Sequence, residues 1–146
     1  MDVLYTTWAR AVGGRAGHVV SDDGVLDLDL AKPPGLGGVP GHRGTNPEQL
    51  FAAGYAACFQ SSIEYAARQR RLRDVETVVT AQVEIGREND RGLALRIDLL
   101  IEVAGVADEM AQELVSSADQ LCPYSKAIRG NVAVTKQVRT SAIVPE

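Results

Sequence analysis

The sequence has few of the residues that mark a metal site, a membrane protein or a nucleic-acid-binding protein. It contains only two cysteines and two histidines, and these are too scattered to match a zinc motif. It has no apolar run of about 18 residues, the length that a membrane-spanning helix needs. Acidic side chains outnumber basic ones by 19 to 15, which argues against sequence-independent nucleic-acid binding. We therefore expect no metal or other cofactor, no membrane contact and no nucleic-acid partner.

The N-terminus also lacks the features of a secretion signal. The segment MDVLY has no basic region followed by an apolar one, so we expect a cytoplasmic protein. In a reducing compartment, two cysteines are more typical of reactive or inert thiols than of a permanent disulfide. Aromatic residues make up only 5%, so the core must come mainly from aliphatic side chains. The length of 146 residues suits one domain, residues 1–146.

Hydrophobic patterning predicts an α+β fold with antiparallel sheets. Alternating apolar residues and short turns indicate an N-terminal three-stranded meander and, later, a long hairpin. Two segments with helical spacing separate the strands, which gives the order βββ-α-ββ-α-β. We expect strands at 3–12, 18–20 and 25–30, a helix from Pro47 to Arg70, strands at 75–85 and 93–103, a helix at 107–121 and a strand at 132–138.

The first expected helix has several start signals and an apolar first half. Asn46 is a favourable N-cap, and Pro47 suits the first helical position. Thr45 and Glu48 have the spacing of a capping box. Residues 50–59 are apolar or small on every side, which indicates a buried helix at the centre of the fold.

The two cysteines are the first candidates for chemistry. Cys58 falls within the expected buried helix, and Cys122 stands just before Pro123, which should end the second helix. Their separation fits no zinc-finger or CxxC motif. Free cysteines are often simple packing residues, so from spacing alone an inert role stays open.

A cation and an acid are candidates for activating such a thiol. Arg15 lies in a turn with glycines on both sides, and a guanidinium beside a thiol lowers its pKa. Glu48 could orient that guanidinium through paired hydrogen bonds. A solvated Arg15 and a Glu48 that only caps the helix are equally compatible with the spacing.

Three segments carry long and specific motifs. Residues 45–59 read TNPEQLFAAGYAACF, residues 122–125 read CPYS, residues 129–132 read RGNV, and residues 13–17 read GGRAG. The first resembles, almost letter for letter, the active-site segment of the organic hydroperoxide resistance (Ohr) branch of the OsmC/Ohr family. The others are similar to its second-cysteine segment and its arginine turn. Ala16 departs from the family pattern, since many relatives carry a charged residue there.

The resemblance implies a thiol-dependent peroxidase that reduces organic hydroperoxides, alkyl or lipid, to alcohols and protects against oxidative stress. Cys58 would form a sulfenic acid, and Cys122 would convert it to a Cys58–Cys122 disulfide that a lipoylated protein or a dithiol reduces. Arg15 would hold the thiolate, and Glu48 would pair with Arg15. Family members intertwine as homodimers in which both chains contribute to each active site, so we expect the same here.

Helix geometry conflicts with the two roles assigned to Arg15. Glu48 and Cys58 would lie about 15 Å apart along a straight helix, too far for Arg15 to reach both. We therefore expect a break or kink near Gly54, because glycine is one of the causes of sharp helix bends.

Three alternatives differ from this interpretation. The nearest is another OsmC-like protein that prefers hydrogen peroxide or a different oxidant, although the segment NPEQLFAAGYAACF favours the Ohr branch. A second is a non-enzymatic binding or redox-sensing protein that keeps the thiols as a switch. A regulator of this kind that acts on DNA should carry a basic recognition helix. The arginines at 68–73 are better explained as cations at a helix C-terminus. The third is a structural protein with inert cysteines.

Overall fold

The computed structural model describes residues 1–141. The chain separates into two compact units, one comprising Met1–Leu50 and the other beginning at Phe51. The single domain expected from the length remains a prediction. Among the described residues, no helix combines the length and the apolar character needed to cross a membrane.

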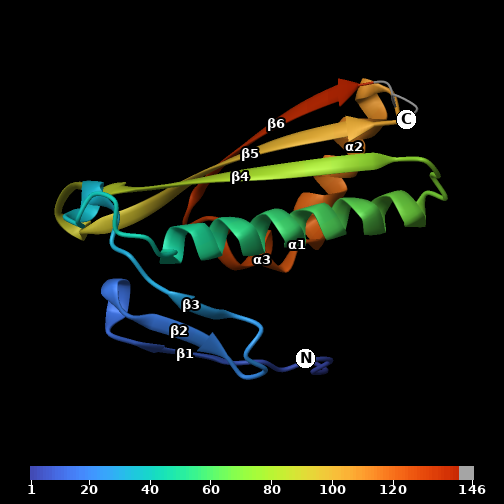
Figure 1. Ribbon diagram of the computed structural model, residues 1–146. Helices are drawn as coiled ribbons and strands as arrows, with labels where there is room; N and C mark the ends of the chain where they lie inside the picture. The colour runs from blue at the N-terminus through green and yellow to red at the C-terminus, as the bar shows by residue number, and fades with distance from the viewer. Residues whose placement is uncertain (142–146) are drawn as a thin grey trace. The chain divides into compact units, whose positions relative to one another are not determined.

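The first unit contains a three-stranded antiparallel sheet, as the meander prediction required. The strands pair in the order β1-β2-β3 and are β1 (Ala9–Val12), β2 (His18–Ser21) and β3 (Asp27–Asp29) (Figure 1). The 3₁₀ helix η1 (Gly14–Ala16) joins β1 to β2, and Gly13 and Gly14 have the positive φ angles that glycine adopts readily. A second 3₁₀ helix, η2 (Pro34–Leu36), lies in the loop before the long helix. Residues 1–8 form no regular element, so the first strand is shorter than expected.

The long helix α1 (Pro47–Gln69) continues through Gly54 without interruption (Figure 1). The predicted break is therefore wrong. A different constraint accounts for the glycine: a Cβ at this position would lie 2.9 Å from the hydroxyl oxygen of Tyr124. The predicted N-cap is confirmed, because the side-chain oxygen of Asn46 accepts a hydrogen bond from the backbone N–H of Gln49 at 2.9 Å.

The helix α1 is buried along one face and not on every side. Tyr55, Phe59 and Ile63 are fully buried, whereas the small residues Ala53 and Ala57 are exposed. Apolar composition did not distinguish these two faces, because alanine is compatible with either environment.

The second unit contains a sheet with the strand order β4-β5-β6. Its strands are β4 (Glu76–Arg87), β5 (Leu93–Ala104) and β6 (Ala133–Ser141). β4 and β5 form the predicted antiparallel hairpin, closed by the 3₁₀ helix η3 (Asn89–Arg91). β6 pairs in parallel with β5, which corrects the expectation of purely antiparallel sheets. Parallel neighbours need a long crossover connection, and two helices supply it here.

These two helices are α2 (Asp108–Leu121) and α3 (Pro123–Ile128). α2 ends before Pro123, as predicted. The proline then occupies the first position of α3, a short helix that the sequence did not predict. Cys122 is the extended residue between the two helices, with φ −61° and ψ 120°.

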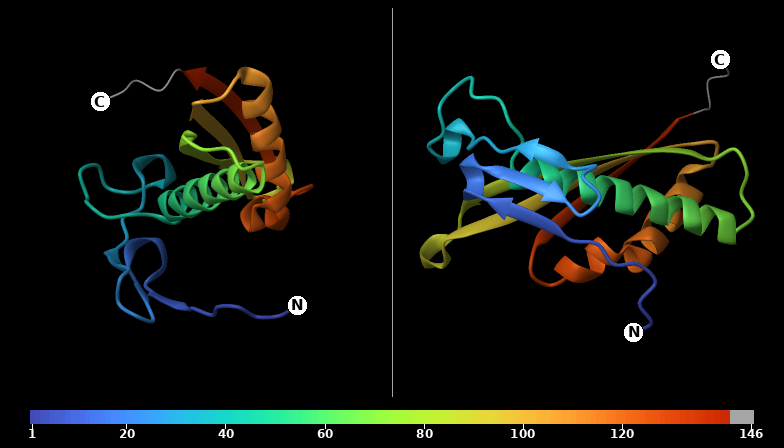
Figure 2. Two further views of the ribbon diagram at one scale, coloured as in Figure 1. Left: turned by 90° about the vertical axis from the view of Figure 1, so that its right-hand side faces the viewer. Right: turned by 60° about the horizontal axis from the view of Figure 1, so that its bottom comes forward.

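The core of the second unit lies between its sheet and its helices. Alternate residues of β5, at positions 97, 99, 101 and 103, are fully buried against side chains of α1 and α2. Both helices therefore cover the same face of this sheet (Figure 2). This packing holds α1 and the end of α2, the two segments that carry the cysteines, in the same layer.

Candidate active site

The two cysteines lie side by side although 64 residues separate them in the sequence. The thiol of Cys122 points to Cys58, with 3.4 Å between the Sγ atoms. A disulfide has an S–S length of about 2.05 Å, so both residues are free thiols that a small movement would join. Cys122 is fully buried and Cys58 partly buried. Only Cys58 is therefore open to a molecule from solvent.

Backbone hydrogen bonds on both sides hold Cys122 in place. Its N–H donates to the carbonyl of Ala118 at 2.8 Å, which closes the last turn of α2. Its carbonyl accepts from the N–H of Lys126 at 3.0 Å, which forms the first turn of α3. Pro123 prevents the two helices from merging, because it disfavours a helical conformation in the residue before it.

The surroundings of Cys58 favour the thiol over the thiolate. Burial raises the pKa of Cys58, and the hydrogen bond from Cys122 raises it further. The backbone N–H of Tyr124 acts in the opposite direction, because it donates a hydrogen bond that favours the thiolate. The net effect is a pKa above the ordinary value, which leaves little thiolate at neutral pH.

Aromatic rings cluster around the two cysteine-bearing segments. Tyr55 stacks against Tyr124 with a centroid distance of 6.1 Å and contacts Phe59 edge to face at 6.2 Å. Phe51 meets the rings of Tyr55 and Tyr124 edge to face. Since Tyr124 is 40% exposed, part of this apolar cluster is open to solvent.

Arg15 and Glu48 form the predicted ion pair. The Nη1 and Nη2 atoms of Arg15 donate to the two carboxylate oxygens of Glu48 at 2.7 and 2.6 Å. The hydrogen bonds lower the pKa of Glu48 and raise that of Arg15. The Thr45–Glu48 capping box is not formed, since Asn46 caps the helix and Thr45 donates to the Gln49 side chain.

The four predicted residues thus form two pairs. Cys58 lies with Cys122, and Arg15 with Glu48. Because α1 is unbroken, its rise separates Glu48 from Cys58 by about 15 Å. The arrangement in which one chain's Arg15 serves both residues required a break in α1, and this break is absent.

A buried hydrogen bond joins Tyr55 and Ser125, two residues that the sequence did not single out. Their hydroxyl oxygens are 2.8 Å apart, and both side chains are buried. Tyr55 precedes Cys58 by three positions and Ser125 follows Cys122 by three. Tyr55 stands in the first cysteine motif and Ser125 in the second. This placement was the sequence signal that could have indicated a role for them near the two thiols.

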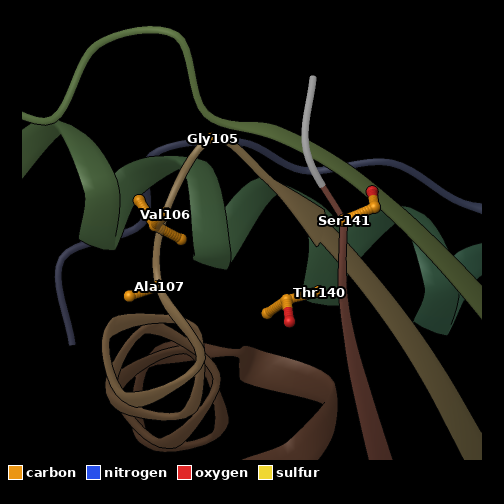
Figure 3. A pocket seen from close by; sticks show the side chains of 5 residues that line it. All are labelled: Gly105, Val106, Ala107, Thr140 and Ser141. Carbon is orange, nitrogen blue, oxygen red and sulfur yellow. The ribbon is translucent and has the colours of Figure 1, made fainter. Parts of the chain in front are cut away.

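Two surface hollows lie elsewhere on the second unit. One, of about 420 Å³, is lined by the loop 105–107 and by Thr140 and Ser141 of β6 (Figure 3). The Thr140 hydroxyl there donates to the carboxylate of Asp108. Another, of about 390 Å³, lies near the β4–β5 turn. Neither is lined by a predicted site residue, and within residues 1–141 no group of His, Cys, Asp or Glu side chains is arranged to hold a metal ion.

Comparison with known proteins places this site in a family. The family of OsmC-like proteins matches residues 40–136. The organic hydroperoxide resistance protein OhrB of Bacillus subtilis is 44% identical over 93% of this chain and 98% of its own. That of Xanthomonas axonopodis pv. citri is 48% identical over 91% of this chain and 93% of its own. The crystal structure of an organic hydroperoxide resistance protein from Elizabethkingia anophelis matches with a TM-score of 0.91 and 45% identity, covering 97% of this chain and 100% of that one. The chain therefore belongs to the OsmC family, in the branch of the organic hydroperoxide resistance proteins.

Proposed function

We propose that the protein confers resistance to organic hydroperoxides by acting as a cysteine-based peroxidase. The names of its relatives support the resistance function. The observation that carries the mechanism is the 3.4 Å separation of two free thiols, one on α1 and one between α2 and α3. Two thiols this close can be oxidised to a disulfide without refolding of the chain.

The reaction takes place in two steps. The Cys58 thiolate attacks the distal oxygen of the hydroperoxide, the O–O bond breaks, and the alkoxide takes up a proton and leaves as the alcohol. Cys58 is then a sulfenic acid. The Cys122 thiolate attacks the Cys58 sulfur, the S–O bond breaks, and the oxygen leaves as water. Two electrons pass from the dithiol to the peroxide, so each turnover requires a reductant.

Burial supports this division of roles between the cysteines. A hydroperoxide can reach Cys58, which is partly exposed, whereas Cys122 is fully buried. The aromatic side chains of Phe51 and Tyr124 add apolar surface next to these segments, which favours alkyl or lipid hydroperoxides over hydrogen peroxide.

The raised pKa of Cys58 calls for a cation that stabilises the thiolate. We assign this role to Arg15 of a second chain, oriented by that chain's Glu48, in a homodimer. The pairing with Glu48 occupies two of the five guanidinium N–H donors, which leaves others for a thiolate. The exposed small residues Ala53 and Ala57 of α1 are consistent with close contact to another chain. Of residues 1–50, only Leu30 and Ala31 are buried, so the first unit has little core of its own.

A lipoylated protein or another dithiol would complete the cycle. One of its thiolates attacks the accessible sulfur of the disulfide, and its second thiol releases the enzyme dithiol. Partial exposure makes Cys58 the sulfur that such a reductant would attack.

The test is to treat the reduced protein with stoichiometric cumene hydroperoxide and to count free thiols by mass spectrometry. Wild type should lose both thiols, and Cys122→Ser should accumulate sulfenic or sulfinic acid on Cys58. Cys58→Ser is the control and should keep its remaining thiol. Faster oxidation by hydrogen peroxide than by cumene hydroperoxide would contradict the substrate assignment, and survival of both thiols in excess hydroperoxide would reject the peroxidase.

A further inference from the structure

The buried hydroxyl pair of Tyr55 and Ser125 has no part in the reaction above. Tyr55 is 0% exposed and Ser125 is 3% exposed, and their oxygens are 2.8 Å apart. One residue is on α1, three positions before Cys58, and the other is on α3, three positions after Cys122. Their hydrogen bond therefore ties together the two segments that carry the sulfur atoms.

We propose that Tyr55 and Ser125 are positioning residues that hold Cys122 where it can reach the oxidised Cys58, and so favour disulfide formation over irreversible oxidation. The proposal rests on the peroxidase function for its biological meaning. The geometric part, that the hydroxyl pair sets the encounter of the two sulfurs, can be tested without any peroxide.

The segment after Cys122 depends on such a contact because α3 is short. It has six residues, and an isolated helix of that length is not stable in water. Ser125 lies in its first turn, so fixing this side chain also fixes the backbone of Cys122 and Tyr124. The same turn places the Tyr124 N–H against the Cys58 sulfur. One hydrogen bond thus supports both contacts that the turn makes with Cys58.

A hydrogen bond is directional, so it fixes the position of α3 along α1 better than apolar packing does. Among residues 1–141, no buried side-chain nitrogen or oxygen lacks a partner, and the two hydroxyl groups satisfy each other. Sliding of α3 along α1 would leave both unpaired in an apolar core, which is unfavourable. Apolar contacts alone would tolerate such sliding, because the hydrophobic effect has no direction. The stacking of Tyr55 on Tyr124 adds a second contact from the same residue to the same turn.

The chemical step shows why position matters. The sulfurs must approach from 3.4 Å to about 2.05 Å as the new bond forms and the sulfenic oxygen leaves as water. A competing hydroperoxide molecule can instead oxidise the sulfenic acid of Cys58 to sulfinic acid. A turn that spends more time away from Cys58 lowers the effective concentration of the Cys122 thiol. More of the Cys58 sulfenic acid is then oxidised irreversibly to sulfinic acid, and less of it forms the disulfide.

The first measurement is the equilibrium between the Cys58–Cys122 disulfide and the dithiol in a defined dithiothreitol buffer. Tyr55→Phe, Ser125→Ala and the double variant should each favour the dithiol about tenfold more than wild type, which raises the reduction potential by about 30 mV. The double variant should change no more than either single variant, because both remove the same bond. Tyr65→Phe is the matched control, since it removes a tyrosine hydroxyl from a 46% exposed position on the same helix.

The second measurement is the yield of Cys58 sulfinic acid after a fixed number of cumene hydroperoxide equivalents. It should increase several-fold in Tyr55→Phe and Ser125→Ala, and not in Tyr65→Phe. Far-UV circular dichroism verifies that each variant folds. If Ser125→Ala does not fold, the comparison of Tyr55→Phe with Tyr65→Phe and wild type tests the proposal.

Three results would overturn the proposal: unchanged potentials and sulfinic yields, a disulfide that becomes more stable, or single effects that add in the double variant. If wild-type thiols resist hydroperoxide altogether, the proposed function fails, but the potentials still test the positioning role.

Discussion

The ion pair between Arg15 and Glu48 should contribute to stability in a way that depends on pH. Both guanidinium-to-carboxylate distances, 2.7 and 2.6 Å, are those of charge-assisted hydrogen bonds. A double-mutant cycle of Arg15→Met and Glu48→Gln isolates the interaction from the other effects of each substitution.

The size of the coupling follows from burial. Hydrogen bonds to charged groups contribute about 1.5–3 kcal/mol in favourable sites, whereas exposed ion pairs contribute about 0–1 kcal/mol. The side chain of Glu48 is 13% exposed, but that of Arg15 is 32% exposed, so solvent weakens the attraction. We therefore expect a coupling of about 1–2 kcal/mol near neutral pH.

The pH dependence has a definite sign. The hydrogen bonds from Arg15 hold the pKa of Glu48 below its ordinary value of 4.5. In acid, the unfolded state therefore binds a proton at Glu48 before the folded state does. The stabilisation is fully present above pH 4.5 and is lost as the pH falls through the lowered folded-state pKa. The coupling should be smaller at about pH 3 than at pH 7.

The sequence provides a local probe for this measurement. Trp8 is the only tryptophan and lies in the first unit, so its fluorescence during urea unfolding reports on that unit. All variants are compared at one protein concentration. The exposed pair Glu64 and Arg68, 3.9 Å apart, lies in the second unit and is the control. Its cycle is followed by far-UV circular dichroism and should give a coupling of less than about 0.5 kcal/mol. A coupling for Arg15 and Glu48 no larger than this control, or equal at both pH values, would refute the reasoning.

Two further predictions concern other parts of the chain. The ring nitrogens of His18 lie 2.8 Å from Asp29 and 2.6 Å from Asp27, and hydrogen bonds to these carboxylates raise its pKa above 6.5. The imidazolium should therefore support β2–β3 pairing below pH 6.5, and this support should disappear as the pH rises through the raised pKa. An NMR titration of His18 measures its pKa, and Asp29→Asn should return that pKa toward 6.5. The second prediction concerns α1: Gly54→Ala should change the unfolding free energy by less than about 1 kcal/mol, since better helix propensity is offset by displacement of the Tyr124 ring. Near-UV circular dichroism should report the displacement, and a gain in stability with an unchanged spectrum would contradict it.

The sequence predicted best the elements whose partners are close in the chain. The alternation in 75–85 and 93–103 was sufficient for the hairpin, because a short turn brings the two strands into register. The first strand was overestimated for the opposite reason. Residues 3–8 are apolar enough for a strand, but β2 pairs with only the four residues Ala9–Val12. The length of a strand depends on its neighbour, which local composition does not contain.

The direction of β6 could not be predicted locally either. Its alternating residues suit a parallel or an antiparallel neighbour equally, and only the placement of α2 and α3 decides between them. The helix α3 was missed because Pro123 signals the end of one helix and the start of another equally well.

The motifs predicted four site residues, and elementary helix geometry showed that an unbroken helix keeps Glu48 too far from Cys58 for one Arg15 to reach both. The expected break at Gly54 is absent. This glycine instead leaves room for the Tyr124 side chain beside an unbroken helix. Under our proposal, a second chain supplies the Arg15 that stabilises the Cys58 thiolate. Arg15 is already held by two hydrogen bonds to Glu48, so the guanidinium is oriented before the chains meet. The entropy of ordering a long side chain is then lost during folding and not during assembly or catalysis. Under this proposal, the ion pair of one chain presents a preorganised cation, Arg15, to the Cys58 of another.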